Sequence, residues 1–248
     1  MPLVLVHDGG GTCYSYWCLN PIGRPVYGIH NPHFHSGDSW PGGLPEMARH
    51  YVALMRQVVP RGRILLGGWS LGGLLSLEMA SILADDTFFT VTGIVMIDSI
   101  CPVAFKTTTL EVVPFKHEWS KTTKQETRIA VERCFEEATK MVAQYDLPKW
   151  EVNINAEANE KRPSTGPPPA ILLRAEQAVP VQPGGVSRVD VARGDRHLGW
   201  DLYRSNMFNQ VVDIPGHHFN IFAMQYIDNV SEKLKMACDT LERSSSSW

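Results

Sequence analysis

The sequence holds little that points to nucleic acid, to secretion or to a disulfide scaffold. Its 248 residues carry 23 Lys and Arg against 26 Asp and Glu, a net charge of −3, so no net positive field favours nucleic acid. No basic segment precedes an apolar stretch at the start, as a secretory signal requires. The five cysteines are scattered without a Cys-x-x-Cys pair, which argues against a disulfide framework and favours a reducing compartment, the cytoplasm.

Several binding motifs are also missing. The chain has no His-Glu-x-x-His pair for zinc and no loop with the spacing of a nucleotide-binding motif. We interpret His30, His33 and His35 as structural or solvated side chains rather than metal ligands. Residues 64–84 are apolar and long enough to span a membrane, but four glycines and Glu78 divide them better into strand, turn and helix. We therefore expect no metal, no bound cofactor and no membrane span.

The alternation of apolar runs with helical patterns predicts an α/β protein. Hydrophobic residues make up 44% of the chain, which is ordinary globular composition. Six short apolar runs, most of them uninterrupted, are typical of buried parallel strands. They cover residues 3–6, 26–29, 63–66, 93–97, 170–173 and 210–214. Helical spacing covers residues 44–58, 71–83 and 223–241. We expect one three-layer α/β domain over residues 1–248 with helices on both faces of a mostly parallel sheet.

One insertion interrupts this alternation. About residues 101–169 separate the fourth and fifth predicted strands, which is far longer than a usual crossover. Its apolar residues recur at intervals of four and three over 131–145, which predicts an amphipathic helix. Such an insertion is either a lid over an active site or a packed decoration of the fold.

The strongest local signal is Gly68-Trp69-Ser70-Leu71-Gly72, a match to Gly-x-Ser-x-Gly. It follows a predicted strand and precedes a predicted helix, the context in which this motif presents a nucleophilic serine. The turn is so tight that glycine is needed two residues before and after the serine. It also places the backbone N–H of Leu71 at a helix N-terminus, where negative charge is stabilised. We therefore predict Ser70 as the nucleophile and Leu71 as an oxyanion donor.

The glycine-rich loop after the first strand is a candidate for the second oxyanion donor. It contains Gly9, Gly10 and Gly11, which let the backbone approach a substrate carbonyl. Either Gly9 or Gly10 can supply the N–H group. His7 and Asp8 precede the nucleophile, and we interpret them as bracing the loop.

The histidine pair His217-His218 supplies the candidate base. It follows the last predicted strand and precedes the last helix, the position of the catalytic histidine in a Ser-acid-His order. Both residues satisfy this order, and only one can face Ser70.

Four aspartates are candidates for the acid. Asp98 ends the strand after the nucleophile strand, whereas Asp190, Asp195 and Asp201 follow the next strand. A carboxylate at the end of a buried apolar strand is costly unless it is paired, and this favours Asp98. Asp195 is the second choice, since the order along the chain fits both.

Together these residues resemble the type I thioesterase domains that release products from fungal polyketide and nonribosomal peptide synthases. The markers are residues 5–12, 67–73, 96–99 and 216–219. The serine turn is shared by all α/β-hydrolases, but the combination is more specific and extends over nearly the whole chain. The resemblance implies an α/β-hydrolase fold with a helical lid and acyl channel at about 101–169. Both a free-standing enzyme and an excised domain fit it.

The resemblance also implies roles for residues that chemistry alone leaves open. It assigns the acid to Asp98, the base to His218 within a Gly-x-His-Phe pattern, and the oxyanion donor beside Leu71 to Gly9. It implies an acyl substrate carried on the phosphopantetheine arm of an acyl or peptidyl carrier protein. No further cofactor is implied.

We therefore expect a serine thioesterase that forms an acyl-Ser70 intermediate and releases a polyketide or peptide chain by hydrolysis or intramolecular cyclisation. The alternatives are a carboxylesterase or acyltransferase acting on small esters, and a non-catalytic α/β-hydrolase used as a binding module. Trp69, Trp119 and Trp150 are candidate linings of the acyl channel, although aromatic residues more often belong to the core.

Overall fold

The central sheet is parallel throughout. The structure, a computed structural model, describes residues 1–113, 119–150 and 166–244. Its six-stranded sheet has the order β2-β1-β3-β4-β6-β8, and every pairing is parallel. The strands are β1 Leu3–Val6, β2 Val26–Ile29, β3 Gly62–Trp69, β4 Phe89–Ile97, β6 Ala170–Gln177 and β8 Gln210–His217. All six predicted strands are present, and the predicted parallel α/β sheet is confirmed.

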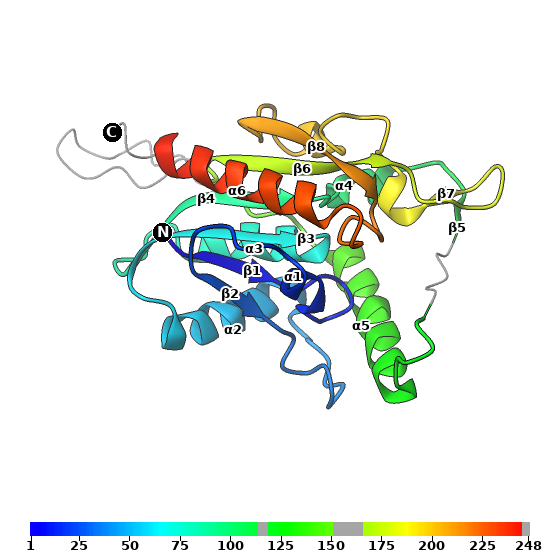
Figure 1. Cartoon of the computed structure of the whole chain (residues 1–248), viewed down its shortest axis with the longest axis horizontal. Coiled ribbons are helices and arrows are strands. Elements are labelled where there is room, and N and C mark those ends of the chain that lie inside the picture. Colours follow the sequence, from blue (N-terminus) through cyan, green and yellow to red (C-terminus); the bar gives the residue numbers. More distant parts are fainter. Residues whose placement is uncertain (114–118, 151–165, 245–248) are drawn as a thin grey trace.

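Helices cover both faces of the sheet (Figure 1). They are α1 Tyr14–Trp17, α2 Gly43–Val58, α3 Leu71–Ile82, α4 Pro102–Thr107, α5 Gln125–Gln144 and α6 Ile227–Ser244. The three helices predicted outside the insertion correspond to α2, α3 and α6. The last begins four residues later than predicted, because the chain after His217 first forms successive turns, including Asn220 N–H to His217 O and Ala223 N–H to Asn220 O.

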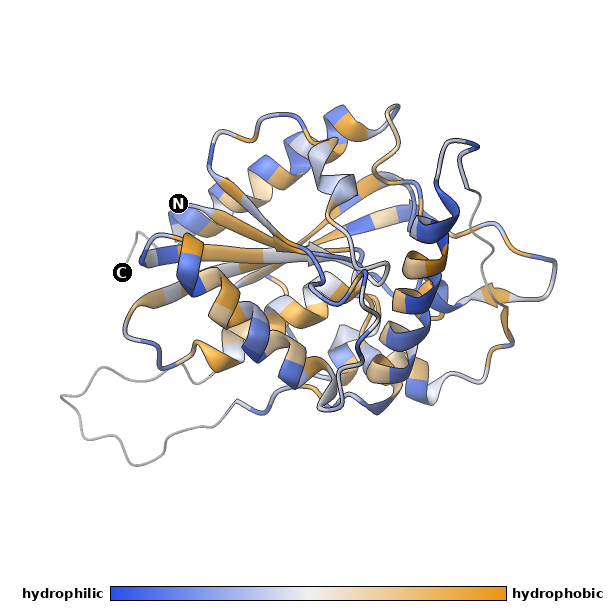
Figure 2. Ribbon diagram, turned by 90° about the horizontal axis from the view of Figure 1, so that it is seen from below, coloured by the Kyte–Doolittle hydropathy of each residue, from blue (hydrophilic) through white to orange (hydrophobic). Residues whose placement is uncertain are grey.

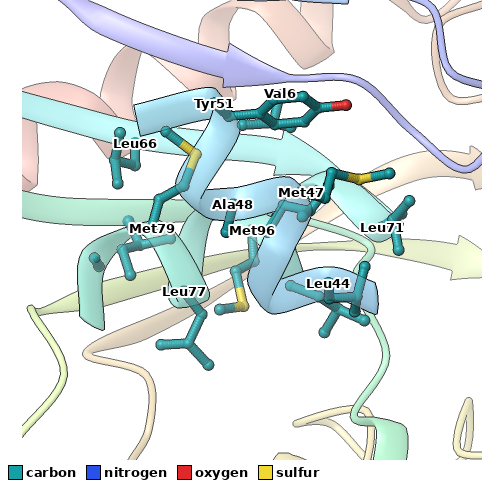
Figure 3. Close-up of a cluster of buried hydrophobic side chains, with 14 of the residues drawn as sticks. Val6, Leu44, Met47, Ala48, Tyr51, Leu66, Leu71, Leu77, Met79 and Met96 are labelled. Atoms are coloured by element: carbon teal, nitrogen blue, oxygen red, sulfur yellow. The ribbon is translucent and has the colours of Figure 1, made fainter. Parts of the chain in front are cut away.

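Alternate residues of the buried strands face two separate cores. In β1, Val4 and Val6 pack toward α2 and α3, whereas Leu3 and Leu5 pack toward α6. Figure 3 shows part of the first core, where side chains of α2 and α3 meet residues from β1, β3 and β4. This arrangement explains the uninterrupted apolar runs, since both faces of each central strand are buried.

The predicted insertion contains three described elements, which are α4, the strand β5 (Val112–Val113) and α5. β5 pairs with β7 (Val186–Ser187) in a second, two-stranded sheet. We call α4, β5, α5, β7 and the adjoining 3-10 helix η1 (Arg188–Asp190) the cap. Figure 2 shows α5 as the upright amphipathic helix beside the end of the central sheet. The amphipathic helix predicted over 131–145 is thus present, whereas strands of two residues carry no readable periodicity. Residues 114–118 and 151–165 of the insertion lie outside the described part of the chain.

The apolar segment 64–84 is divided between β3, a tight turn and α3. Within the described residues, no helix has the length and hydropathy needed to cross a membrane.

Candidate active site

Ser70 lies at a sharp turn between β3 and α3. Its backbone has φ 56° and ψ −115°, a conformation that costs energy for any residue with a side chain. A Cβ atom on Gly68 would lie 2.6 Å from the backbone carbon of Gly72, and one on Gly72 would lie closer still to the carbonyl oxygen of Val6. Both glycines are therefore required by close backbone approach, as the motif predicts.

The turn is tied to its neighbours by Tyr16 on the short helix α1. The N–H of Trp69 donates to the Tyr16 hydroxyl at 2.8 Å, and that hydroxyl donates to the carbonyl oxygen of Val6 at 2.7 Å. The N–H of Ser70 donates to the carbonyl oxygen of Ile97 at 2.9 Å. Burial raises the pKa of Tyr16 well above its ordinary value, so the hydroxyl keeps its proton.

Two backbone N–H groups near Ser70 are open. Those of Gly9 and Leu71 make no hydrogen bond to any described residue, and both residues line the same cavity as Ser70. The N–H of Gly10 donates to Asp8 Oδ1 at 3.1 Å and is therefore occupied. The geometry favours Gly9 over Gly10 as the partner of Leu71, in agreement with the resemblance.

Asp98 and His218, the candidate acid and base, are in contact with each other. His218 Nδ1 lies 2.8 Å from Asp98 Oδ2, and both side chains are buried. Asp98 follows β4 with φ 46°, and its Oδ1 accepts the Ala175 N–H at 2.9 Å. His218 lines the cavity together with Ser70, although the described residues include no direct hydrogen bond between the two. Catalytic hydrogen bonds are often long without substrate.

A buried arginine, Arg193, also binds the carboxylate of Asp98. Arg193 donates to Asp98 Oδ1 at 2.6 Å and to Oδ2 at 2.7 Å, and its Nε donates to Asp190 Oδ1 at 2.8 Å. Burial alone would raise the pKa of Asp98, but the hydrogen bonds from Arg193 and His218 hold it well below its usual range. Burial would lower the pKa of Arg193, but its two carboxylate partners raise it. Asp98 is therefore ionised at neutral pH.

The second histidine of the pair has a different role. The N–H of His217 donates to Asn220 Oδ1 at 2.7 Å, and its ring Nδ1 accepts the Phe219 N–H at 3.3 Å. His217 is half-buried and is not among the residues that line the cavity. It therefore supports the turn that carries His218.

The remaining acid candidates do not reach the base. Asp195 accepts the N–H groups of His197 at 3.0 Å and Gly199 at 2.7 Å, and Asp201 Oδ2 lies 2.8 Å from His197 Nδ1. Asp195, His197 and Asp201 thus bring possible metal-ligand atoms within 4.8 Å of one another, which their sequence spacing did not indicate. Their mutual hydrogen bonds account for this partly exposed cluster.

His7 and Asp8 brace the glycine loop. His7 Nε2 lies 2.6 Å from the Tyr51 hydroxyl, and Nδ1 lies 2.5 Å from the carbonyl oxygen of Asp8. Burial lowers the pKa of His7 to about 4. Burial raises the pKa of Asp8 to about 7, although the Gly10 N–H works against this shift.

A cavity of about 390 Å³ opens beside Ser70 and lies between the sheet and the cap. Most of its lining is apolar. The lining residues are Gly9, Ser70, Leu71, Leu74, Ile100, Phe105, Val112, Val113, Phe135, Ala138, Thr139, Val142, Ser187, Arg188, Val189, His218 and Phe219. Phe135 of α5 packs on the glycine loop, where a Cβ atom on Gly9 would lie 3.0 Å from its ring.

The three tryptophans proposed for the channel are not brought to this cavity. The Trp69 ring packs 5.4 Å from His218 and 5.2 Å from Phe222, centroid to centroid, within the second core. Trp150 donates through Nε1 to the Tyr203 hydroxyl at 2.9 Å beside a separate groove. Trp119 is half-buried and precedes α5. Trp69 and Trp150 pack against the two cores, and none of the three tryptophans is among the described residues that line the cavity beside Ser70.

Sequence reasoning missed Arg193, Arg188 and Tyr16. The Asp-x-x-Arg spacing of 190 and 193 indicates a local ion pair, but nothing in it indicates the contact with Asp98. Tyr16 lies in a helix of four residues, which is too short to show a period. Arg188 lies beside a strand of two residues. No local pattern identifies any of the three.

Comparisons with known proteins find similarity over almost the whole chain. The model of the Thioesterase domain family matches residues 1–238. Thioesterase frbD of Dothideomycetidae sp. is 38% identical over 248 residues, which cover 98% of this chain and 90% of frbD. Nonribosomal peptide synthetase imqB of Aspergillus flavus is 31% identical over 98% of this chain and 8% of its own length. The crystal structure of the NocB thioesterase domain in covalent complex with a fluorophosphonate nocardicin G analog has the same fold. It aligns with a TM-score of 0.66 and 24% identity over 96% of this chain and 94% of its own.

Proposed function

This chain belongs to the thioesterase domain family and is a hydrolase, and from that premise we propose that it releases acyl chains from thioesters through an acyl-Ser70 intermediate. The observation that carries the proposal is the placement of Ser70, His218 and two open N–H groups around one apolar cavity. The hydrogen bond of 2.8 Å between His218 and Asp98 completes a Ser-Asp-His arrangement.

Acylation begins when His218 Nε2 takes the proton of Ser70 and Oγ attacks the thioester carbonyl carbon. The oxyanion that forms accepts hydrogen bonds from the N–H groups of Leu71 and Gly9, each worth about 3–4 kcal/mol in comparable sites. Asp98 keeps the His218 ring oriented and stabilises its cation. The C–S bond then breaks, and the thiolate leaves with the proton held by His218.

Deacylation repeats these steps with a second nucleophile. His218 deprotonates a water molecule, or a nucleophilic group of the bound chain itself, and the product is a free acid or a ring. Ser70 recovers its proton from His218. We propose that the acyl chain occupies the apolar cavity and that its thioester is carried on the phosphopantetheine arm of an acyl or peptidyl carrier protein. The match to a segment of a nonribosomal peptide synthetase supports such a carrier. The steps require no other cofactor.

Mass spectrometry of the intact protein tests the proposal. The protein is mixed with a panel of acyl-N-acetylcysteamine thioesters, with Ser70→Ala as the variant and Ser36→Ala, an exposed serine, as the control. We expect a covalent acyl adduct or released product with the wild type and Ser36→Ala, but not with Ser70→Ala. The released mass distinguishes hydrolysis, which adds water, from cyclisation.

Other outcomes would reassign the activity. Faster turnover of a matched oxyester would indicate a carboxylesterase, and transfer of the chain to added alcohols or amines would indicate an acyltransferase. Failure of both the thioesters and a fluorophosphonate probe to modify Ser70 would indicate a binding module.

A further inference from the structure

Among the described residues, the lining of the cavity beside Ser70 includes one permanently charged side chain. Among its described lining residues, Arg188 is the only charged side chain other than the titratable His218, and none is acidic. Arg188 begins η1, so the cap supplies this charge. The surrounding walls come from apolar residues of α4, α5 and β5. Because the surrounding walls are apolar, a cation there attracts an entering anion more strongly than it would in water.

The described residues leave the guanidinium of Arg188 with few hydrogen-bond partners. It lies 5.1 Å from the ring centroid of Phe105, and Nη2 makes one long hydrogen bond of 3.5 Å to the carbonyl oxygen of Thr139. Within the described residues, no carboxylate lies within ion-pair distance of Arg188, whereas Arg193 in the same segment binds two. Burial lowers the pKa of Arg188, yet an arginine remains charged at neutral pH. A guanidinium has five donors in a fork that matches carboxylate and phosphate oxygens.

We propose that Arg188 binds an anionic group of the thioester substrate inside the catalytic cavity. The group is a carboxylate on the acyl chain or the phosphate of the pantetheine arm, and both present oxygens that the guanidinium can bind in pairs. This inference rests on the proposed thioesterase function. It makes Arg188 a specificity residue, because neutral chains leave its donors without a partner.

Matched substrates separate the two sources of the anion. The first arm compares N-acetylcysteamine thioesters of dicarboxylic acids with those of monocarboxylic acids of equal chain length, over short, medium and long chains. The second arm compares phosphopantetheine with N-acetylcysteamine thioesters of one monocarboxylic acid. We expect kcat/KM of the wild type to favour the anionic member of one arm by about tenfold or more. Arg188→Met should abolish that preference, and Arg188→Lys should restore part of it.

Arg196→Met is the matched control, since Arg196 is exposed, pairs with Asp213 and lies outside the cavity lining. An unchanged ratio for Arg188→Met in both arms would overturn the inference while Ser70-dependent turnover upheld the proposed function. If no thioester is turned over, calorimetry decides the inference separately. Amide analogues of the same paired substrates should then bind the wild type more tightly when anionic, and equal binding would overturn it.

A separate observation concerns the charges behind the catalytic acid. Asp190, Arg193, Asp98 and His218 form a buried series in which each member contacts the next. Arg193 alone would cancel the charge of Asp98, but Asp190 restores a net charge of about −1 behind the histidine. We infer that Arg193 and Asp190 are positioning residues. Arg193 orients both carboxylate oxygens of Asp98. Asp190 offsets the unfavourable effect of the positive charge of Arg193 on protonated His218.

The pH dependence of kcat/KM tests this balance. Removal of the negative charge in Asp190→Asn makes protonated His218 less favourable, so the acid limb should move to lower pH by about one unit. Arg193→Gln should move it to higher pH by a similar amount. Arg193→Lys keeps the charge without the planar fork, so it should leave the limb in place and lower kcat. Among the described residues, His217 interacts electrostatically with His218 and Arg188 lines the same cavity, and both are unchanged in these variants.

Asp195→Asn is the control, because Asp195 makes its hydrogen bonds to His197 and Gly199 instead. A purely structural role would reduce activity in Asp190→Asn and Arg193→Gln with neither limb displaced, and that result would overturn the inference. If Arg193→Gln does not fold, Asp190→Asn and Arg193→Lys still decide it. The inference would be contradicted by an acid limb that stays in place in Asp190→Asn, or by one that moves in Arg193→Lys.

Discussion

The two halves of the candidate active site are positioned by different forces. On the nucleophile side, backbone geometry holds Ser70 in place through a positive φ and the close approach of Gly68 to Gly72. On the acid–base side, buried charges hold Asp98, which binds His218 and Arg193 through charge-assisted hydrogen bonds. The first half should therefore be sensitive to added volume, and the second to altered charge. Substitutions that change only the volume or only the charge of a side chain can separate these two dependences.

Gly72→Ala should have the largest effect. Its Cβ atom would overlap the carbonyl oxygens of Val6 and His7, so either β1 or α3 must move. We expect the free energy of unfolding to fall by more than about 4 kcal/mol and activity to be lost, as measured by urea denaturation and thioester turnover. Gly194→Ala is the control, since nothing lies within 4 Å of its added methyl group, and it should change stability by less than about 0.5 kcal/mol. Equal effects of the two substitutions would show that close approach does not control the turn.

Asp98→Asn tests the charged half with almost no change in volume. Turnover should fall by up to about ten-thousand-fold, because an amide neither fixes the His218 tautomer nor stabilises its cation. The fold should persist, since Arg193 keeps its ion pair with Asp190. Steady-state kinetics and a thermal melt measure both properties. Asp195→Asn should leave turnover near that of the wild type, and the opposite result would transfer the acid role to Asp195.

Tyr16→Phe should have a smaller effect on the nucleophile half. The substitution removes the hydroxyl that links the Trp69 N–H to the carbonyl oxygen of Val6, which leaves two buried backbone groups without that partner. We expect a loss of about 1–3 kcal/mol in the free energy of unfolding, and a decrease in kcat larger than any change in KM. Tyr14→Phe is the control because Tyr14 is exposed. If kcat stays constant while stability falls, Tyr16 supports the fold and not the turn.

The same contrast explains what the sequence could predict. The strands and the serine turn depend on local patterns, and β1 and β2 were predicted residue for residue. Asp98 and His218 could be proposed from their positions after strands, because the carboxyl ends of parallel strands meet at one edge. Arg193 could not, since it lies in the irregular segment between β6 and β8 and not at the end of a predicted strand. The tryptophans were chosen by residue type, which does not indicate whether a ring faces a cavity or a core.

The glycine loop is positioned both by backbone geometry and by buried ionisable side chains. His7 and Asp8 are buried side by side, and both are favoured in their uncharged forms. The pKa of His7 falls from 6.5 to about 4 on folding, so its stabilising contribution is present above pH 6.5 and is lost as the pH falls toward 4. The pKa of Asp8 rises from 3.8 to about 7, so its contribution is present below pH 3.8 and is lost as the pH rises through 7.

Asp8→Asn separates these two contributions because it keeps an acceptor for the Gly10 N–H and removes the ionisation. The difference in free energy of unfolding between variant and wild type should therefore shift in favour of the variant, by about 2–3 kcal/mol, between about pH 5 and about pH 8. Urea denaturation at both values measures this shift, and Asp38→Asn, at an exposed carboxylate, should produce none. A constant difference for Asp8→Asn would mean that Asp8 is ionised at both values. The backbone of the glycine loop would then be held by a charge, as Asp98 and His218 are.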